Sequence, residues 1–543
     1  MVIDSTIKKT KSLCPECKKV IDANIIEENG KVLMNKKCLE HGEFSDILSI
    51  NPAHFRWSQN FMIDGQKPIE PCVQTTKGCP FDCGSCPNHK SSPAIAICDI
   101  TYRCNLKCPI CFANAESRGL NYEPSFEELI RIYKHFRNIK PQPPIVAMYA
   151  GGEPTVRNDL PELLSECVKM GYQQLQIATN GIRLANIDYF QELIDAGLPN
   201  STKNNRTRTC IYFQFDGIER ETYIKTRGAD ILDKKLKVIE NARELNFQNM
   251  ILVPTIAKGV NDHEITNILQ YAIDNIDVVS TVMYQPMAMC GRYDKEKLHE
   301  MRITSSHLAK ELQDYTHGKV GKTYPLPTIS KFAKVIAWLN NEPPVEFTCN
   351  ADCGFANFMF VDPKTKTLTG IDDFVDADKF LEISDKWYKR VEREKKWESE
   401  GKTGLFGRFF NRARKEILKA RIFGELALTM RPPQALLNNF SDPISVVRNF
   451  ADTVLNTSWE SSSNWLINGN VLLVGLMHFQ DLYNFDLERV SRCLVHYGYI
   501  DPVTNQVRQV PFCAMNAVHR ERIEDELQQG NKMVQYIPDM KSN

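Results

Sequence analysis

The sequence predicts an α/β protein whose central part is a parallel sheet covered by helices, either open or curved into a partial barrel. Between residues 94 and 320, short apolar runs alternate six times with amphipathic helix patterns. Pairs and triplets of cysteines lie before and after this series, which indicates small metal-binding units attached to the sheet. We therefore expect a partial (β/α)6 barrel with a rubredoxin-like or zinc-ribbon-like N-terminal unit and a C-terminal auxiliary iron–sulfur domain.

The strands and helices of the central series are expected at regular intervals. The apolar runs interpreted as strands are 94–100, 145–150, 173–179, 210–215, 250–255 and 278–285. The helices are expected at 126–138, 160–170, 187–196, 233–245, 263–275 and 305–316. Because ligands of such sheets bind at the carboxyl ends of the strands, the residues that follow each run are the first candidates for a functional site.

Composition and length indicate a multidomain globular chain without an overall affinity for polyanions. The 543 residues are 42% hydrophobic, and 67 Lys and Arg residues balance 67 Asp and Glu residues, so we expect no nucleic-acid partner. The chain shows neither the apolar core of a signal peptide nor a spanning helix, which predicts a cytoplasmic location. We divide it into 1–50 (mononuclear metal unit), 51–93 (cluster segment), 94–320 (barrel) and 321–543 (auxiliary cluster domain).

Eighteen cysteines are the unusual feature of the composition. Eleven of them lie between Cys14 and Cys111, most of them two or three residues from another cysteine. Such spacing suits several sulfurs around one metal centre but not disulfide geometry. Cys167, Cys210 and Cys290 stand alone inside helix or strand patterns, so we interpret them as core residues.

The first fifty residues predict a mononuclear metal site. Cys14 and Cys17 precede an expected hairpin around Asn29-Gly30, and Cys38 and His41 follow it. Two turns that present paired ligands across a hairpin are typical of zinc ribbons and rubredoxin-like sites. The spacing suits iron and zinc alike.

Cys104, Cys108 and Cys111 directly follow the first strand of the series. Three thiolates in this C-x3-C-x2-C spacing can hold three irons of a [4Fe–4S] cubane and leave the fourth iron open for a chelating ligand. The run from Gly151 to Pro154, Gly-Gly-Glu-Pro, directly follows the second strand. Both motifs therefore lie at the strand ends where a ligand site is expected.

These two motifs resemble those of the radical SAM superfamily. The resemblance implies that the open iron binds S-adenosylmethionine (SAM), which is reductively cleaved to a 5′-deoxyadenosyl radical that abstracts hydrogen from an unactivated carbon. An electron donor such as ferredoxin or flavodoxin is implied as a partner. The implied catalytic ligands are Cys104, Cys108 and Cys111, and the implied cofactor-binding residues are Gly151, Gly152, Glu153, Pro154, Asn180, Gln214, Asp216 and Thr255. Glu153 and neighbouring backbone groups are expected to accept hydrogen bonds from the methionyl ammonium.

Two further cysteine groups predict auxiliary [4Fe–4S] clusters, three clusters in total. Cys79, Cys83 and Cys86 repeat the C-x3-C-x2-C spacing, with Cys72 and Cys98 as candidates for the fourth ligand, although Cys98 can equally be a core residue. Downstream, four cysteines remain, enough to bind all four irons of one [4Fe–4S] cluster: Cys349, Cys353, Cys493 and Cys513.

The whole combination resembles the archaeal tetraether lipid synthase subgroup of radical SAM enzymes. The matching runs include Gly78–Pro87, Asn484–Arg489 and Pro511–Cys513. This resemblance implies a lipid-like hydrocarbon substrate and carbon–carbon bond formation. The chain departs from the subgroup at Ser92-Pro93-Ala94, where a cysteine is usual, and this bears on the fourth ligand of the second cluster.

Other functions stay open at this point. A radical SAM methylase, or another modification of a pterin, small molecule or peptide, is the first alternative. An iron–sulfur electron carrier or redox sensor is the second, and the run Gly151–Pro154 counts against it because a carrier needs no SAM pocket. The basic and apolar segment 404–423 predicts either a peripheral contact with the inner membrane face or an amphipathic helix packed on the domain. We expect a monomer, although the sequence does not define the oligomeric state.

Overall fold

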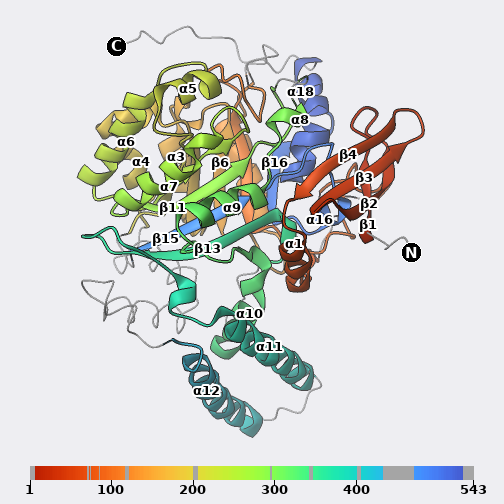
Figure 1. Cartoon of the computed structure of the whole chain (residues 1–543), viewed down its shortest axis with the longest axis vertical. Coiled ribbons are helices and arrows are strands. Elements are labelled where there is room, and N and C mark those ends of the chain that lie inside the picture. Colours follow the sequence, from red (N-terminus) through yellow and green to blue (C-terminus); the bar gives the residue numbers. More distant parts are fainter. Residues whose placement is uncertain are drawn as a thin grey trace.

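The computed structural model describes residues 6–69, 73, 75–84, 86–115, 122–199, 206–293, 296, 298–341, 347–399, 405–431 and 470–529. Its N-terminal unit is a four-stranded antiparallel sheet in chain order, shown in red in Figure 1: β1 (Thr6–Leu13), β2 (Val20–Glu28), β3 (Lys31–Cys38) and β4 (Gly42–Ser49). Asn29 and Gly30 have φ values of 50° and 71° between β2 and β3. Two left-handed residues in a two-residue turn are what a tight hairpin needs, and the predicted hairpin is confirmed.

The central sheet contains six parallel strands that pair in chain order. They are β5 (Ile95–Thr101), β6 (Val146–Gly151), β7 (Gln174–Thr179), β8 (Thr209–Gln214), β9 (Met250–Val253) and β11 (Val279–Pro286), and the short β10 (Thr255–Ile256) pairs with β11. In the residues that the structure describes, β5 and β11 do not pair with each other, so the barrel is partial. Every strand predicted for this series is confirmed.

Helices follow the strands and cover the sheet. They are α2 (Phe126–Arg137), α3 (Leu160–Lys169), α4 (Ile187–Ala196), α5 (Arg220–Arg227), α6 (Leu232–Glu244), α7 (Ile265–Asp274), α8 (Leu298–Met301) and α9 (Ser305–Tyr315). Single 3-10 turns add η2 (Pro154–Val156), η3 (Ile182–Ala185) and η4 (Asp262–Glu264). The six predicted helices are present, whereas α5 was not predicted because its sequence, RETYIKTR, is polar and short.

In the part of residues 321–543 that the structure describes, the strands join the central sheet, whereas the sequence predicted a separate domain. The strands of this region are β12 (Tyr324–Pro325), β13 (Gly354–Val361), β14 (Leu368–Gly370), β15 (Val471–Met477), β16 (Val495–Ile500) and β17 (Val507–Pro511). β15 pairs in parallel with β11, and β16 pairs in parallel with β5. A partial barrel exposes unpaired backbone groups at both edges, and the C-terminal strands satisfy them. β13 and β14 pair as an antiparallel hairpin.

A unit of three helices extends below the sheet in Figure 1: α10 (Ser330–Asn340), α11 (Ala377–Ser399) and α12 (Leu405–Ala427). From α12, Leu418 and Ile422 are buried against Trp387 of α11. This packing favours the amphipathic-helix interpretation of the segment 404–423, of which residue 404 and the side chains of 405–413 lie outside the described part. No helix among the described residues is long and apolar enough to cross a membrane.

The remaining helices and turns lie outside the central β/α series. They are α1 (Pro52–Ser58), η1 (Gln59–Phe61), η5 (Leu326–Ile329), η6 (Ala351–Cys353), η7 (Ile371–Asp373), α16 (Leu487–Ser491), α17 (Phe512–Ala514), η8 (Met515–His519) and α18 (Arg520–Gln529). Arg302 joins the N-terminal sheet to the segment after β15. Its guanidinium donates to Asp46 of β4 at 3.1 Å and to Asp481 of that segment at 2.7 Å. All three side chains are buried. The N-terminal unit is therefore docked by a buried ion network rather than tethered loosely.

Candidate active site and metal centres

The loop after β5 carries the three cysteines of the predicted SAM cluster. Burial, together with smaller contributions from the charges of Glu153, Cys108 and Cys111, raises the pKa of Cys104 to about 12, so the three cysteines lie close enough to interact. Burial also raises the pKa of Cys108, while Arg227 lowers it and hydrogen-bonds to the thiol. Half-buried thiols with raised pKa values suit a site in which bound iron would stabilise the thiolates. The donor set therefore matches an open [4Fe–4S] cluster.

Glycines at the end of β6 allow its backbone to contact this loop directly. A Cβ atom on Gly151, which has φ +123°, would lie 2.1 Å from the Thr101 carbonyl oxygen, and one on Gly152 would lie 2.1 Å from that of Arg103. In their place, the Gly152 amide donates to the Thr101 carbonyl at 2.8 Å. The Gly-Gly pair is thus required to join the strand end to the cluster loop.

Glu153 is buried and already carries several hydrogen bonds. Its carboxylate accepts from the Thr155 and Thr179 hydroxyls, each at 2.6 Å, and from the Asn180 amide at 2.8 Å. These bonds tie the end of β6 to the end of β7. The Glu153 carboxylate therefore holds the two strand ends together. Its contact with the methionyl ammonium stays a prediction. Pro154 begins the turn η2 directly after it.

The remaining predicted cofactor residues meet at the same edge of the sheet. The Asn180 side chain donates to Asn105 of the cluster loop at 2.7 Å. The Thr255 amide donates to Asp216 at 3.1 Å. Lys235 donates to the carbonyl of Asn180 and to the side chain of Gln214. Burial lowers the pKa of Lys235 to about 7.

Arg227 is a site residue that the sequence analysis missed. It forms two hydrogen bonds with Asp216, at 2.5 and 2.8 Å, and contacts the thiol of Cys108. Although burial opposes ionisation of Asp216, the Arg227 guanidinium holds the pKa of that carboxyl below its usual value. Arg227 lies on α5, the helix without a sequence pattern, and this is why it escaped notice.

A second missed contact comes from the segment after β11. Arg292 donates from its guanidinium to the carbonyls of Cys108 and Ala115, and its backbone forms two hydrogen bonds with Cys111. Gly291 has φ +69°, and a Cβ atom there would lie 2.2 Å from the Cys111 carbonyl oxygen. The cluster loop is thus clamped from both ends of the parallel series, by β6 and by the segment after β11.

The N-terminal site has the geometry of a four-coordinate metal ion. The ligand atoms of Cys14, Cys17, Cys38 and His41 all lie within 4.8 Å of one another. Three separations are 3.7 Å (Cys14–His41), 3.9 Å (Cys17–Cys38) and 3.5 Å (Cys38–His41). A tetrahedron with metal–sulfur bonds of about 2.3 Å has edges of about 3.8 Å. The His41 hydrogen bond lowers the pKa of Cys38 to about 6, which favours the thiolate that a metal binds.

The second cysteine loop is organised by Asp82. Its carboxylate accepts from the backbone amides of Thr76, Lys77 and Gly78 and thereby closes the turn that carries Cys79 and Cys83. Burial, with a contribution from the charge of Cys86, raises the pKa of Cys79 to about 12. The three cysteines therefore share one loop, as a cluster requires.

The predicted fourth ligand of this second cluster is not placed by the structure. Cys72 lies outside the described residues. Cys98 points into the helix-covered core with Cys167 and Tyr133, whereas its neighbour Ile97 packs in the core cluster that contacts Cys79. Successive residues of a strand face opposite sides of the sheet, so Cys98 is turned away from the loop. We correct the assignment of Cys98 accordingly, to the core residue that the sequence left as its alternative.

The four C-terminal cysteines converge despite their separation in sequence. The hydrogen bond with Cys353, burial and the charge of Cys493 all raise the pKa of Cys349. Burial and the charges of Cys513 and Cys353 raise the pKa of Cys493. Arg489 contacts the Cys353 thiol. The fully buried Asn350 side chain also has an amide nitrogen without a hydrogen-bond partner. Buried donors beside four thiols suit the sulfides of an auxiliary cluster.

Aromatic rings connect the SAM cluster loop to the C-terminal cysteines. Phe112, which follows Cys111, stacks on Phe512, which precedes Cys513, with ring centroids 5.4 Å apart. Phe479 stacks on the same Phe512 ring at 4.4 Å. An apolar and aromatic wall therefore separates the two cysteine groups.

The three-cysteine loop at the carboxyl edge of a partial parallel barrel is the arrangement of a radical SAM fold. The family model of the radical SAM superfamily matches residues 98–272, and that of the HMPTM N-terminal zinc ribbon domain matches residues 6–50. The 7,8-dihydro-6-hydroxymethylpterin dimethyltransferase of Methanocaldococcus jannaschii is 38% identical over 522 residues, which cover 95% of each chain. The chain belongs to the family of this dimethyltransferase and is a radical SAM enzyme.

Two more distant likenesses cover less than half of the chain. A probable GTP 3′,8-cyclase of Archaeoglobus fulgidus is 27% identical over 172 residues, 32% of this chain and 52% of that protein. Streptococcus suis SuiB bound to S-adenosylmethionine has a TM-score of 0.33 and 16% identity over 42% of this chain and 49% of that one, which is too slight to carry an argument. The predicted superfamily is confirmed, and the comparisons support the methylase alternative better than the tetraether lipid interpretation.

Proposed function

We propose that the protein transfers methyl groups to carbon atoms of a pterin or a related small heterocycle. The observation that carries this proposal is the identity of 38% over 522 residues with a pterin dimethyltransferase. A bound cluster with SAM supplies a 5′-deoxyadenosyl radical, which removes a hydrogen atom from the substrate carbon. If SAM also donates the methyl group, replacing C–H by C–CH3 consumes two SAM molecules and two electrons and yields 5′-deoxyadenosine, methionine and S-adenosylhomocysteine. A ferredoxin or flavodoxin would supply the electrons.

The chain's own residues supply position and shielding. Cys104, Cys108 and Cys111 would hold the SAM cluster, and the strand edge with Asp216 and Arg227 borders it. The ring wall beside Phe112 offers a flat apolar surface of the kind on which an aromatic heterocycle stacks. Zinc is the metal that the zinc-ribbon match supports for the N-terminal site, and three clusters in total are part of the proposal.

The test is product formation by the anaerobically reconstituted enzyme. With SAM, a one-electron reductant and 7,8-dihydro-6-hydroxymethylpterin, we expect 5′-deoxyadenosine together with a methylated pterin detected by mass spectrometry. The variant Cys108→Ala should form neither product. Formation of 5′-deoxyadenosine without any change in the pterin would overturn the substrate assignment while leaving the radical SAM class intact.

A hydrocarbon chain is a second candidate substrate, and an apolar cluster at the strand edge favours it. Ala257, Met287 and Met289 follow β10 and β11, are buried, and pack against Ile110 of the SAM cluster loop. Methionine side chains in such a cluster are flexible and can adapt to an apolar group beside them. Deuterated substrates distinguish the two candidates, because the abstracted hydrogen enters 5′-deoxyadenosine. Deuterium from a labelled long-chain phospholipid, and none from a labelled pterin, would favour the lipid.

A further inference from the structure

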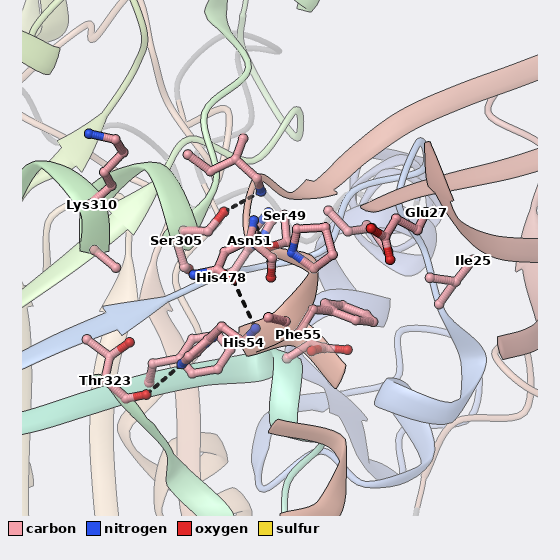
Figure 2. A pocket seen from close by; sticks show the side chains of 18 of the residues that line it. Ile25, Glu27, Ser49, Asn51, His54, Phe55, Ser305, Lys310, Thr323 and His478 are labelled. Atoms are coloured by element: carbon pink, nitrogen blue, oxygen red, sulfur yellow. Dashed lines mark hydrogen bonds between the residues drawn. The ribbon is translucent and has the colours of Figure 1, made fainter. Parts of the chain in front are cut away.

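A cavity of about 550 Å³ lies between the N-terminal sheet, α1, the first turn of α9 and the segment after β15 (Figure 2). None of the SAM-site residues that the structure describes lines it. It adjoins the C-terminal cysteines, because the His478 amide donates to the Cys353 carbonyl at 3.1 Å and Arg489 contacts the Cys353 thiol. Arg489 also belongs to the run Asn484–Arg489, to which the radical SAM chemistry assigns no role.

Four buried polar side chains line this cavity with an atom that has no hydrogen-bond partner. The atoms are Ser305 Oγ, His478 Nε2, Asn484 Nδ2 and Arg489 Nε. The four residues are only 4%, 5%, 0% and 4% exposed, respectively. Buried donors without a partner are unfavourable, so four such groups beside one cavity indicate a ligand that satisfies them.

The unmet groups are mainly donors, and the neighbouring acceptors are already used. The Asp486 carboxylate accepts from Thr10 at 2.6 Å and pairs with Lys8 at 3.3 Å. Asp352 accepts from the Gln59 side chain at 2.9 Å. The unmet Nδ2 of Asn484 and Nε of Arg489 can only donate. The first turn of α9 adds the partial positive charge of a helix N-terminus.

The opposite wall of the cavity is apolar. It is formed by Ile25 and Met34 of the N-terminal sheet together with Leu48 and Phe55. Figure 2 shows Ile25 and Phe55 on one side and Ser305 and His478 on the other. A ligand that meets both walls must combine an anionic group with an apolar body.

We propose that this cavity binds a small organic anion, a carboxylate or phosphate ester with a short apolar body. The anionic group accepts hydrogen bonds from Asn484, Arg489 and Ser305, and the apolar body lies against Met34 and the side chains around it. The N-terminal sheet then forms part of a ligand site in addition to its metal site. Binding at this place would couple the N-terminal unit to the region of the C-terminal cysteines.

The test is isothermal titration of the reconstituted holoenzyme with hexyl phosphate. The key variant is Asn484→Asp, because Oδ1, which accepts from the Asp481 amide at 3.0 Å, is retained while the donor becomes an acidic oxygen. We expect saturable binding by the wild type and a dissociation constant at least about tenfold higher in this variant. Ser305→Ala, which removes only a hydroxyl, should weaken binding in the same direction.

Three controls keep the result interpretable. Asn35→Asp makes the same change at a residue whose Oδ1 accepts from Ser45 on the exposed face of the N-terminal sheet, and it should leave the affinity unchanged. Metal content and SAM cleavage without the probe report folding of each variant. Inorganic phosphate and hexanol should each bind more weakly than hexyl phosphate. Absence of saturable binding by the wild type, equal affinity in Asn484→Asp, or equal binding of either partial probe would overturn the proposal.

Discussion

Removal of the Arg227 guanidinium should destabilise the fold and the SAM site together. The Asp216 side chain is fully buried, the Arg227 side chain is 11% exposed, and their two contacts are 2.5 and 2.8 Å long. In Arg227→Met the carboxylate would lose its charge partner without gaining access to water. Breaking a buried pair in this way costs about 3–5 kcal/mol, a large fraction of the stability of an ordinary domain.

A double-variant cycle tests whether the uncompensated charge causes the loss. Denaturant unfolding of the reconstituted protein should show the full cost in Arg227→Met and a recovery of about 2 kcal/mol or more when Asp216→Asn is added. Formation of 5′-deoxyadenosine should stay low in both variants, because the contact with Cys108 is lost in each. An unfolding free energy of the single variant within about 1 kcal/mol of the wild type, or strictly additive effects, would refute the reasoning.

Three further predictions concern other parts of the molecule. Cys17→Ser should release the N-terminal metal, which elemental analysis of the purified protein measures; full retention of the metal would contradict the four-ligand site. Gly291→Ala should cost about 1–3 kcal/mol more than Gly259→Ala, because both glycines have positive φ but only the first Cβ meets a neighbour, the Cys111 carbonyl at 2.2 Å. Equal unfolding free energies of these two variants would argue against the close contact. Burial lowers the pKa of His519 to about 4. Its neutral form is favoured in the fold, so stability falls as pH drops from the unfolded value of about 6.5 toward that number. His519→Gln should therefore reduce the loss of stability between about pH 7 and pH 5.5 by about 1 kcal/mol, and an unchanged pH dependence would contradict this.

The sequence predicted the central series well because its signal is local. Most strands of the parallel series read as short, largely buried apolar runs, and each of the six predicted helices carries one apolar stripe. The Gly-Gly pair at 151–152 and the cysteine loop at 104–111 were placed correctly for the same reason, since each directly follows such a run. α5 was missed because tertiary contacts of Thr222 and Tyr223, rather than a stripe, keep it in place.

The strands that pair with the two edges of the central parallel series could not be predicted from local patterns. No local pattern indicates that β15 pairs with β11 or that β16 pairs with β5, and this is why residues 321–543 were expected to be a separate domain. The face of the sheet on which Cys98 lies could not be predicted either, because a strand buried on both sides shows no alternation of polar and apolar residues.

The sequence by itself therefore determined the chemistry: three cysteines in one loop, four ligands around one hairpin, and a Gly-Gly pair at a strand end. These motifs are recognisable because metal ligands close in space are here also close in the chain. Only the tertiary structure decided which distant groups complete each site, such as Arg227 and Arg292 at the cluster loop, and Asn484 beside the N-terminal sheet. Their positions depend on pairing and docking between elements far apart in the chain, and such contacts leave no spacing in the sequence.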